Sequence, residues 1–351
     1  MRVQRQRPFR VLLVDAVLSL SNRARPLFTG DALLRVGNGV TPGRMPEVVE
    51  TSEPDVILLE LPASESAAES ALAAIEAVMA QRPTPILVLQ RVKGAQAFRA
   101  LSLGALDLVT LPEEAAPPEA HEAFWRALQH RVELLAQVRV VRHVRGMRRL
   151  RNEARTRSGL EDAPYPIVAI AASLGGPKAL AQLLSALPRS LTAPVCICQH
   201  ISEGFTGALA TWLSQETGQR VEEAQHDAML EPGRVYVAPS GQHFRVAAQG
   251  RVRLDAEPPI AGFRPSCDAL LESVARSFGR RAVGVILTGM GRDGAQGLKA
   301  IRDMGGRTLA QDELSCAVWG MPREAVKLGA AERVLPLDDL PQAIVQLVDE
   351  C

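Results

Sequence analysis

The sequence has few of the features that mark some common protein classes. Its 351 residues include only five cysteines, Cys196, Cys198, Cys267, Cys316 and Cys351, which are too scattered for a disulfide framework in a chain of this length. Lys and Arg nearly balance Asp and Glu, and the formal net charge is +1. No global field therefore favours nucleic acid or an anionic membrane. Recognition of a partner must be local.

Long hydrophobic runs are also missing. No apolar stretch reaches about 18 residues, the length of a membrane-spanning helix. The basic start MRVQRQRPFR leads into a short strand-like run, with no sign of a cleaved signal peptide. We therefore expect a cytoplasmic protein that does not insert into a membrane.

Apolar residues are plentiful and are arranged in two sets of strands and helices. They make up 47% of the chain, enough for more than one core, so we expect two domains. From Phe9 to about Pro112, short apolar runs such as PDVILLELP and TPILVLQ alternate with Ala-rich helical stretches. This alternation is typical of a parallel sheet with crossover helices. It predicts an α/β domain over residues 1–116.

Residues 117–163 lack a strand signal. Their first part is helix-forming, and their second part is Arg-rich and loop-like, which predicts a linker that is helical early and mobile late. The arginines favour a solvated face, with contact to an acidic partner as the alternative. Strand and helix alternation then resumes, and it predicts a second, mainly parallel and doubly wound α/β domain over residues 164–351.

The second domain begins with YPIVAIAASLGGPKALAQLL, in which a strand must turn sharply into a helix at Ser173, Gly175 and Gly176. Glycine permits such a turn and the close approach of a substrate. A serine here is either a nucleophile beside free backbone N–H groups or simply the cap of the helix. This stretch alone leaves both possibilities open.

Two further residues strengthen the interpretation of Ser173 as a nucleophile. His200 ends the strand PVCICQH, and Asp293 follows another strand in the loop GMGRDG. The carboxyl ends of parallel strands share one edge of a sheet, so the three side chains can converge. Serine, histidine and aspartate then form a nucleophile, its general base and the group that orients the base.

Two other interpretations compete for the same residues. Gly289–Gly294 satisfies the G-x-G-x-x-G pattern between a strand and a helix, and Asp312 lies 19 residues beyond Asp293, as a dinucleotide site requires. Cys196, Cys198 and His200 alternate along one strand face and offer three zinc ligands. We favour buried core cysteines without a metal, because free cysteine is among the most buried residue types.

The motifs AIAASLGGPKAL, CICQHISEGFTGALATWL and VILTGMGRDGAQGL together resemble the CheB-type protein-glutamate methylesterases, and the likeness extends over nearly all of Tyr165 to Leu340. It implies that Ser173 is the nucleophile, His200 the base and Asp293 its orienter, with the Met290 N–H in the oxyanion hole. Leu174 departs from the threonine that the family often has, which alters a hydrogen bond near the cleft but leaves the triad intact.

The resemblance also implies an activity. The family hydrolyses glutamyl methyl esters on the cytoplasmic helices of chemoreceptors and releases methanol, and some members deamidate receptor glutamines. No metal or cofactor is required. Frizzy-type sensory pathways of gliding bacteria use such an esterase too. The partners expected from the family are methylated chemoreceptors, with other chemosensory proteins as candidates for the first domain.

The first domain resembles a phosphorylation-controlled receiver, a flavodoxin-like α/β fold, but its chemistry does not carry over. Asp15 is followed by Ala16, where a receiver has a second acidic residue for magnesium. Glu60 stands in place of the aspartate that accepts phosphate. The remaining two receiver positions hold Gln90 and Leu111, so the lysine that would pair with a phosphoryl group is missing. We expect no phosphorylation and interpret Glu60 as a solvated carboxylate, with mimicry of phosphoaspartate as the alternative.

Two rival functions remain. The first is a non-catalytic adaptor whose two domains bind partners of a chemosensory complex, which would be favoured only if the triad were absent. The second is a dinucleotide-binding enzyme. We expect the first domain to act as a docking surface or a fixed brake on the second.

Overall fold

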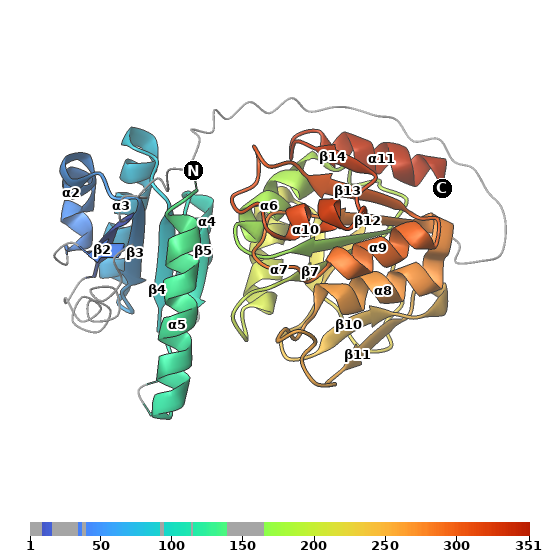
Figure 1. The fold of residues 1–351 in the computed structure, drawn as a ribbon, viewed down its shortest axis with the longest axis horizontal. Helices are drawn as coiled ribbons and strands as arrows, with labels where there is room; N and C mark the ends of the chain where they lie inside the picture. The colour runs from blue at the N-terminus through green and yellow to red at the C-terminus, as the bar shows by residue number, and fades with distance from the viewer. Residues whose placement is uncertain (1–8, 16–33, 37–39, 92–94, 114, 139–164) are drawn as a thin grey trace, which may run out of the picture. The chain divides into compact units, whose positions relative to one another are not determined.

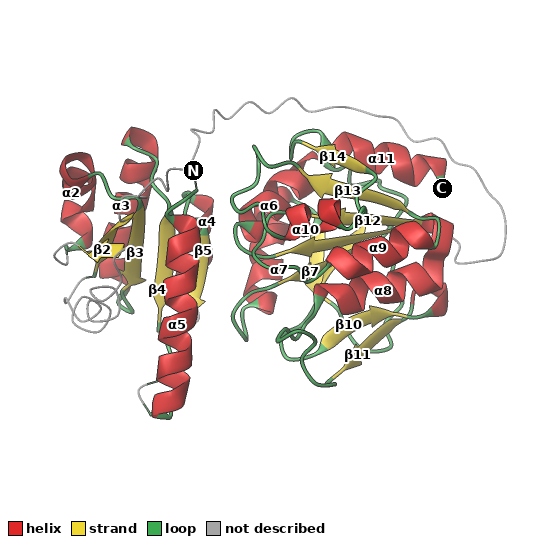
Figure 2. Ribbon diagram, in the orientation of Figure 1, coloured by secondary structure: helices red, strands yellow, loops and turns green. Residues whose placement is uncertain are grey.

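The computed structural model describes residues 9–15, 34–36, 40–91, 95–113, 115–138 and 165–351 (Figure 1). The chain forms two compact units, Met1–Arg145 and Gly146–Cys351. Both consist of a parallel sheet with helices on it, as Figure 2 shows by colour. The predicted α/β fold class is confirmed.

The first unit is built on a five-stranded sheet. Its strands are β1 (Phe9–Val14), β2 (Leu34–Val36), β3 (Val56–Leu61), β4 (Ile86–Gln90) and β5 (Asp107–Thr110). They lie in the order β2-β1-β3-β4-β5, and every neighbouring pair is parallel. This is the strand order of flavodoxin-like folds. The strands are mainly apolar because helices cover the sheet, and all six residues of β3, including Glu60 near its end, are buried.

Helices α2 (Met45–Ser52), α3 (Glu65–Gln81), α4 (Ala95–Ser102) and α5 (Pro118–Leu135) accompany this sheet, with a short 3₁₀ turn, η1 (Pro42–Arg44). Helix α5 packs against β4, and its buried residues Leu128, Val132 and Leu135 share one face. Arg131 on the same helix forms an ion pair of 3.0 Å with Asp107 of β5. The helix that the sequence assigned to the linker is therefore part of the first unit.

The remainder of the predicted linker, with most of its arginines, falls in residues 139–164, outside the described residues. The interpretation of those arginines and of a mobile late linker therefore stays a prediction. None of the helices in the described ranges is long and apolar enough to cross a membrane.

The second unit is built on a seven-stranded sheet. Its strands are β6 (Ile167–Ala172), β7 (Val195–Gln199), β8 (Arg220–Glu223), β9 (Arg234–Val237), β12 (Ala282–Ile286), β13 (Arg307–Gln311) and β14 (Arg333–Leu335). They are ordered β14-β13-β12-β6-β7-β9-β8, and all pairs are parallel. The chain extends from β6 in one direction to β7 and later in the other direction to β12. Such a reversal of strand order is where ligands bind in open α/β sheets.

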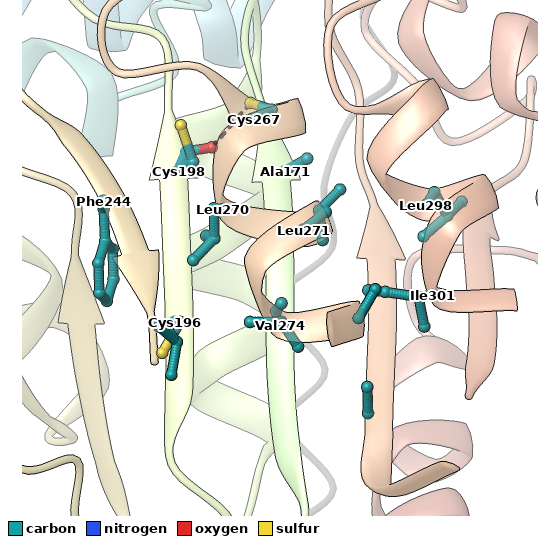
Figure 3. Packing of buried hydrophobic residues seen from close by; sticks show 14 of the residues in the cluster. Ala171, Cys196, Cys198, Phe244, Cys267, Leu270, Leu271, Val274, Leu298 and Ile301 are labelled. Carbon is teal, nitrogen blue, oxygen red and sulfur yellow. Dashed lines mark hydrogen bonds between the residues drawn. The ribbon is translucent and has the colours of Figure 1, made fainter. Parts of the chain in front are cut away.

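Two rows of helices cover this sheet. One row is α8 (Cys267–Phe278), α9 (Ala295–Asp303) and α10 (Met321–Lys327), and the other is α7 (Thr206–Thr217), α6 (Gly176–Ala186) and α11 (Leu340–Glu350). The unit also has an antiparallel hairpin of β10 (His243–Val246) and β11 (Val252–Asp255), and 3₁₀ turns η2 (Ala248–Gly250) and η3 (Gly279–Arg281). Helix α8 packs on β6, and its apolar residues enter a buried core with those of β7 and β10 (Figure 3).

Candidate active site

Ser173 lies immediately after β6, at the reversal point of the sheet. It is 8% exposed, and its N–H donates to the carbonyl of Thr288 at 3.1 Å, which fixes it beside the end of β12. The residue that caps α6 is Gly175, with φ of 77°. A Cβ atom on Gly175 would lie 2.5 Å from the Ala317 Cβ atom. Ser173 is therefore not the helix cap, and its hydroxyl is left for another role.

His200 lies next to Ser173 because β6 and β7 are neighbours. Ala172 is in register with Gln199, and the His200 N–H donates to the Ala172 carbonyl at 3.0 Å. The ring atom Nε2 lies 2.8 Å from Asp293 Oδ2, whereas Nδ1 is buried and has no hydrogen-bond partner among the described residues. A carboxylate only accepts, so Nε2 carries the proton and Nδ1 presents a lone pair.

Asp293 is held by four donors. Besides His200 Nε2, it accepts hydrogen bonds from Ser266 Oγ at 2.8 Å and from the N–H groups of Cys267 at 2.7 Å and Asp268 at 3.0 Å. These three residues form the start of α8, where free N–H groups and the helix dipole favour an anion. The carboxylate is thereby fixed in one orientation toward the histidine ring.

Helix α9 is anchored in the same way. Asp268 Oδ1 accepts from the N–H groups of Gly294 at 2.8 Å and Gly297 at 2.7 Å. The start of α8 thus binds the Asp293 carboxylate. The Asp268 carboxylate of α8 in turn binds the start of α9, which follows Asp293 in the chain. This pairing locks the loop after β12 to α8.

Burial and direct contacts together set the pKa values of His200 and Asp293. Burial alone would raise the pKa of Asp293, but the hydrogen bond and charge of His200 outweigh it, and the pKa is lowered. Burial alone would lower the pKa of His200, whereas Cys267 and Asp293 raise it, and the net pKa is raised. Burial raises the pKa of the Cys267 thiol well above its ordinary value. Cys267 is therefore uncharged at neutral pH, and Asp293 is the anion that acts on His200.

An aromatic ring covers the histidine. The Phe263 ring is stacked on His200, with ring centroids 4.0 Å apart and an interplanar angle of 2°. Phe263 closes a tight turn with Ile260 in which Ala261 and Gly262 have φ of 51° and 88°. The stacking restricts rotation of the imidazole ring.

Gln199 connects the serine and histidine segments. Its side-chain Nε2 donates to the carbonyls of Ser173 and His200, both at 2.8 Å. A Cβ atom on Gly176 would lie 2.0 Å from Gln199 Oε1, so the glycine leaves room for this side chain. Gln199 is thus a positioning residue between the two strand ends.

We expect Gln199→Glu to lower kcat about tenfold or more with little change in KM. The substitution keeps the shape but removes both donors, and leaving buried carbonyls unpaired costs about 1–3 kcal/mol. Gln215, an exposed residue of α7, supplies the control Gln215→Glu. Steady-state kinetics on the two variants check this, and equal kcat values would contradict the positioning role.

The loop after β12 brings Met290 to the same place. A Cβ atom on Gly289 would lie 2.7 Å from Ser173 Cβ and 2.3 Å from Met321 Sδ, so only glycine fits against the serine. The Gly289 carbonyl accepts from the N–H groups of Gly320 and Met321 at 3.1 and 2.9 Å. Met290, predicted from the family resemblance to offer its N–H to an oxyanion, is the next residue.

The contacts of Asp312 and the cysteines bear on the dinucleotide-site and zinc-site interpretations of these motifs. Asp312, which a dinucleotide site would place on a ribose, accepts from the N–H and Oγ of Ser315 at 2.9 and 2.5 Å in its own turn. Cys196 and Cys198 are both fully buried in the core. Among the residues that the structure describes, the Cys/His group within ligand distance comprises Cys198 and His200 with Cys267, and Cys196 is not in it.

The degenerate receiver site differs from the expectation at Glu60. Its side chain is not solvated: the residue is 8% exposed, and Arg91 Nε donates to its carboxylate at 3.0 Å. The lysine position after β5 holds Leu111, but Arg91 supplies a cation from the residue that follows β4. Asp15, Gln90 and Leu111 are buried. Ala16 lies outside the described residues.

The comparisons with known proteins agree with this geometry. Residues 168–344 match the family model described as CheB methylesterase. The chain belongs to the CheB methylesterase family. It is 51% identical to the protein-glutamate methylesterase FrzG of Myxococcus xanthus, over 98% of this chain and 99% of that protein.

A second relative and a solved structure extend the match. The chain is 45% identical to protein-glutamate methylesterase/protein-glutamine glutaminase 2 of Anaeromyxobacter dehalogenans, over 97% of both chains. The crystal structure of the Thermotoga maritima CheB methylesterase catalytic domain is 37% identical, with a TM-score of 0.51, and covers 52% of this chain and 99% of that one. The family resemblance seen in the sequence is confirmed.

Several residues of the site escaped the sequence argument. Gln199, Phe263 and the start of α8 were assigned no role. One signal for the helix start was present: Ser266 caps α8 by accepting from the Ala269 N–H at 3.3 Å, and serine before an apolar run is a common helix cap. No local pattern points to the side chains that these residues contact.

Proposed function

We propose that the chain is a serine hydrolase that demethylates glutamyl methyl esters and releases methanol. The observation that supports this most is the His200–Asp293 pair of 2.8 Å, with the unpartnered Nδ1 of His200 beside the end of β6, where Ser173 lies. The relatives named protein-glutamate methylesterase cover almost the whole chain. Methanol release from a methylated receptor fragment tests the proposal.

The mechanism follows from the hydrogen bonds. Ser173 Oγ attacks the ester carbonyl while Nδ1 of His200 takes its proton, and Asp293 stabilises the imidazolium that forms. The Met290 N–H stabilises the oxyanion. His200 then gives the proton to methoxide, and methanol leaves. A water molecule, activated by His200, hydrolyses the acyl-enzyme and regenerates the serine.

Receptor glutamines are a second substrate in this proposal. The Anaeromyxobacter relative is named a protein-glutamine glutaminase as well as a methylesterase. The same acyl-enzyme forms from a glutamine side chain, with ammonia leaving in place of methanol, so Ser173 and His200 serve both reactions. An amide requires protonation of its leaving group, which the His200 imidazolium supplies.

The proposal assigns the hydrolase to residues 164–351 and places the protein in the cytoplasm with methylated chemoreceptors as partners. Other chemosensory proteins are the partners that we propose for the first domain. An adaptor without catalysis would bind receptor but release no methanol, which separates the two functions in one assay.

We expect acetyl phosphate with magnesium to leave the demethylation rate unchanged. Glu60 is one methylene longer than the aspartate that accepts phosphate in a receiver, and its ion pair with Arg91 occupies the cation that a phosphoryl group would need. Without differential affinity for two states, a phosphodonor shifts no equilibrium. Rate measurements with and without the donor check this.

A truncated chain that begins near Tyr165 tests the role of the first domain in the same assay. It should differ from the full chain in rate or receptor binding, because we propose that the first domain docks a partner or restrains the hydrolase. A rise in activity with the phosphodonor, abolished by Glu60→Ala, would contradict the proposal for the receiver site. Equal rates and binding for the two chains would remove the docking and brake roles.

A further inference from the structure

Two cysteines adjoin the histidine of the site from different elements. Cys198 is the penultimate residue of β7, two positions before His200, and Cys267 is the first residue of α8. Their Sγ atoms and a ring nitrogen of His200 all lie within 4.8 Å of one another. The hydrolytic mechanism uses neither thiol. Figure 3 shows both sulfurs near the carboxyl end of β7, with Cys196 nearer the start of the strand.

We propose that Cys198, Cys267 and His200 form an inhibitory Zn²⁺ site. Two thiolates and an imidazole are the donors that zinc prefers, and three protein ligands leave a fourth position for another group. Zinc at this site would inhibit because it binds His200, the base of the proposed hydrolase. The inhibition therefore rests on the proposed function, whereas zinc binding does not.

The distances fit a tetrahedral ion with small movements. Zn–S of about 2.3 Å and Zn–N of about 2.0 Å at tetrahedral angles require S···N of about 3.5 Å and S···S of about 3.8 Å. Cys267 Sγ already lies 3.5 Å from His200 Nε2. The Cys198 sulfur lies within 4.8 Å of both atoms. An adjustment of about 1 Å, within reach of a χ1 rotation, therefore completes the set.

The surroundings also suit a divalent cation. The Asp293 carboxylate, whose Oδ2 lies 2.8 Å from Nε2, places a negative charge beside the ion, and the fourth position is open to water. Two thiolates neutralise Zn²⁺, which limits the cost of placing the ion in a buried site. On binding, both thiols and His200 Nε2 lose their protons to solvent, and no bond other than those to hydrogen and metal changes.

Zinc at this place would stop catalysis in two ways. Coordination of Nε2 replaces its hydrogen bond to Asp293, so the carboxylate no longer stabilises an imidazolium. A cation bonded to the ring also lowers the proton affinity of Nδ1, and the Ser173 proton is no longer accepted. The metal-free protein is the active one, and the protein needs no metal for its reaction.

The test uses the full chain, dialysed against a chelator and kept reduced with a phosphine. We expect full activity without metal, and added Zn²⁺ should inhibit methanol release reversibly at one ion per chain. Cys198→Ala should raise the zinc concentration for half-inhibition about tenfold or more and keep its metal-free activity. Cys196→Ala is the matched control, because Cys196 is equally buried on the same strand but outside the cluster, and it should respond like the parent chain.

Cobalt provides a readout that is independent of activity. Co²⁺ bound by two thiolates and an imidazole gives a sulfur-to-metal absorption band, which Cys198→Ala and Cys267→Ala should lose and Cys196→Ala should keep. If the Ala variant at residue 198 fails to fold, Cys198→Val serves in its place. A band with no methanol release in the metal-free chain would sink the proposed function and leave the metal site standing. Zinc inhibition that is absent, or that persists undiminished in the variants at residues 198 and 267, would overturn the site.

Discussion

Ser173→Ala and His200→Ala should each lower kcat for methanol release by about 10⁴-fold or more, because nucleophile and base act as one unit. Loss of the hydroxyl removes the acyl-enzyme route, and loss of the imidazole leaves the serine proton without an acceptor. The double variant should be no slower than either single variant, since the two residues contribute to the same step.

Ser190→Ala is the matched control for the serine, because Ser190 is exposed in the turn after α6. It should keep normal turnover. Steady-state methanol assays on a methylated receptor fragment compare the four variants with the parent chain, and thermal unfolding verifies the fold of each. Near-normal demethylation by Ser173→Ala would show that another residue is the nucleophile.

Asp293→Asn should lower kcat about 10³- to 10⁴-fold and also move the pH profile. Turnover requires neutral His200, so activity rises as pH increases through the pKa of that residue. Burial opposes the charge on the ring, whereas contact with Cys267 and Asp293 raises this pKa. In the parent chain the rise is therefore centred above the ordinary value of 6.5 for histidine, and the substitution should shift it toward lower pH.

The control is Asp303→Asn, which changes an exposed carboxylate at the end of α9 that pairs with Lys299. It should leave the position of the rise in place. Rate profiles between about pH 5 and 10, which span the ordinary histidine range, measure both variants. A midpoint that stays fixed in Asp293→Asn would mean that Asp293 does not set the basicity of His200.

The gathering of Ser173, His200 and Asp293 was predictable because each follows a strand. Parallel strands bring their carboxyl ends to one edge, so three strand-end residues converge whenever their strands are neighbours. The alternation of apolar runs and helical stretches predicted that sheet, since buried parallel strands are apolar throughout. The observed order β12-β6-β7 places the three strands side by side.

Strand order itself was not encoded in any local pattern. Gln199 reaches the Ser173 carbonyl across 26 positions of sequence, and Cys267 reaches His200 across 67. Arg91 reaches Glu60 across 31 positions, which is why that carboxylate was expected in solvent and is instead paired. Each contact depends on register and on where a helix begins, to within about 1 Å for a hydrogen bond.

The sequence by itself thus determined the α/β class, the catalytic family and the residues that stand at the strand ends. Tertiary structure alone decided their partners: the start of α8 around Asp293, the ring of Phe263 on His200, and the choice of Cys267 over Cys196 as the sulfur beside Cys198. The physical reason is the distance along the chain over which each feature forms. Strand and helix patterns repeat over a few residues, whereas hydrogen bonds and ligand sets form between elements that only packing brings together.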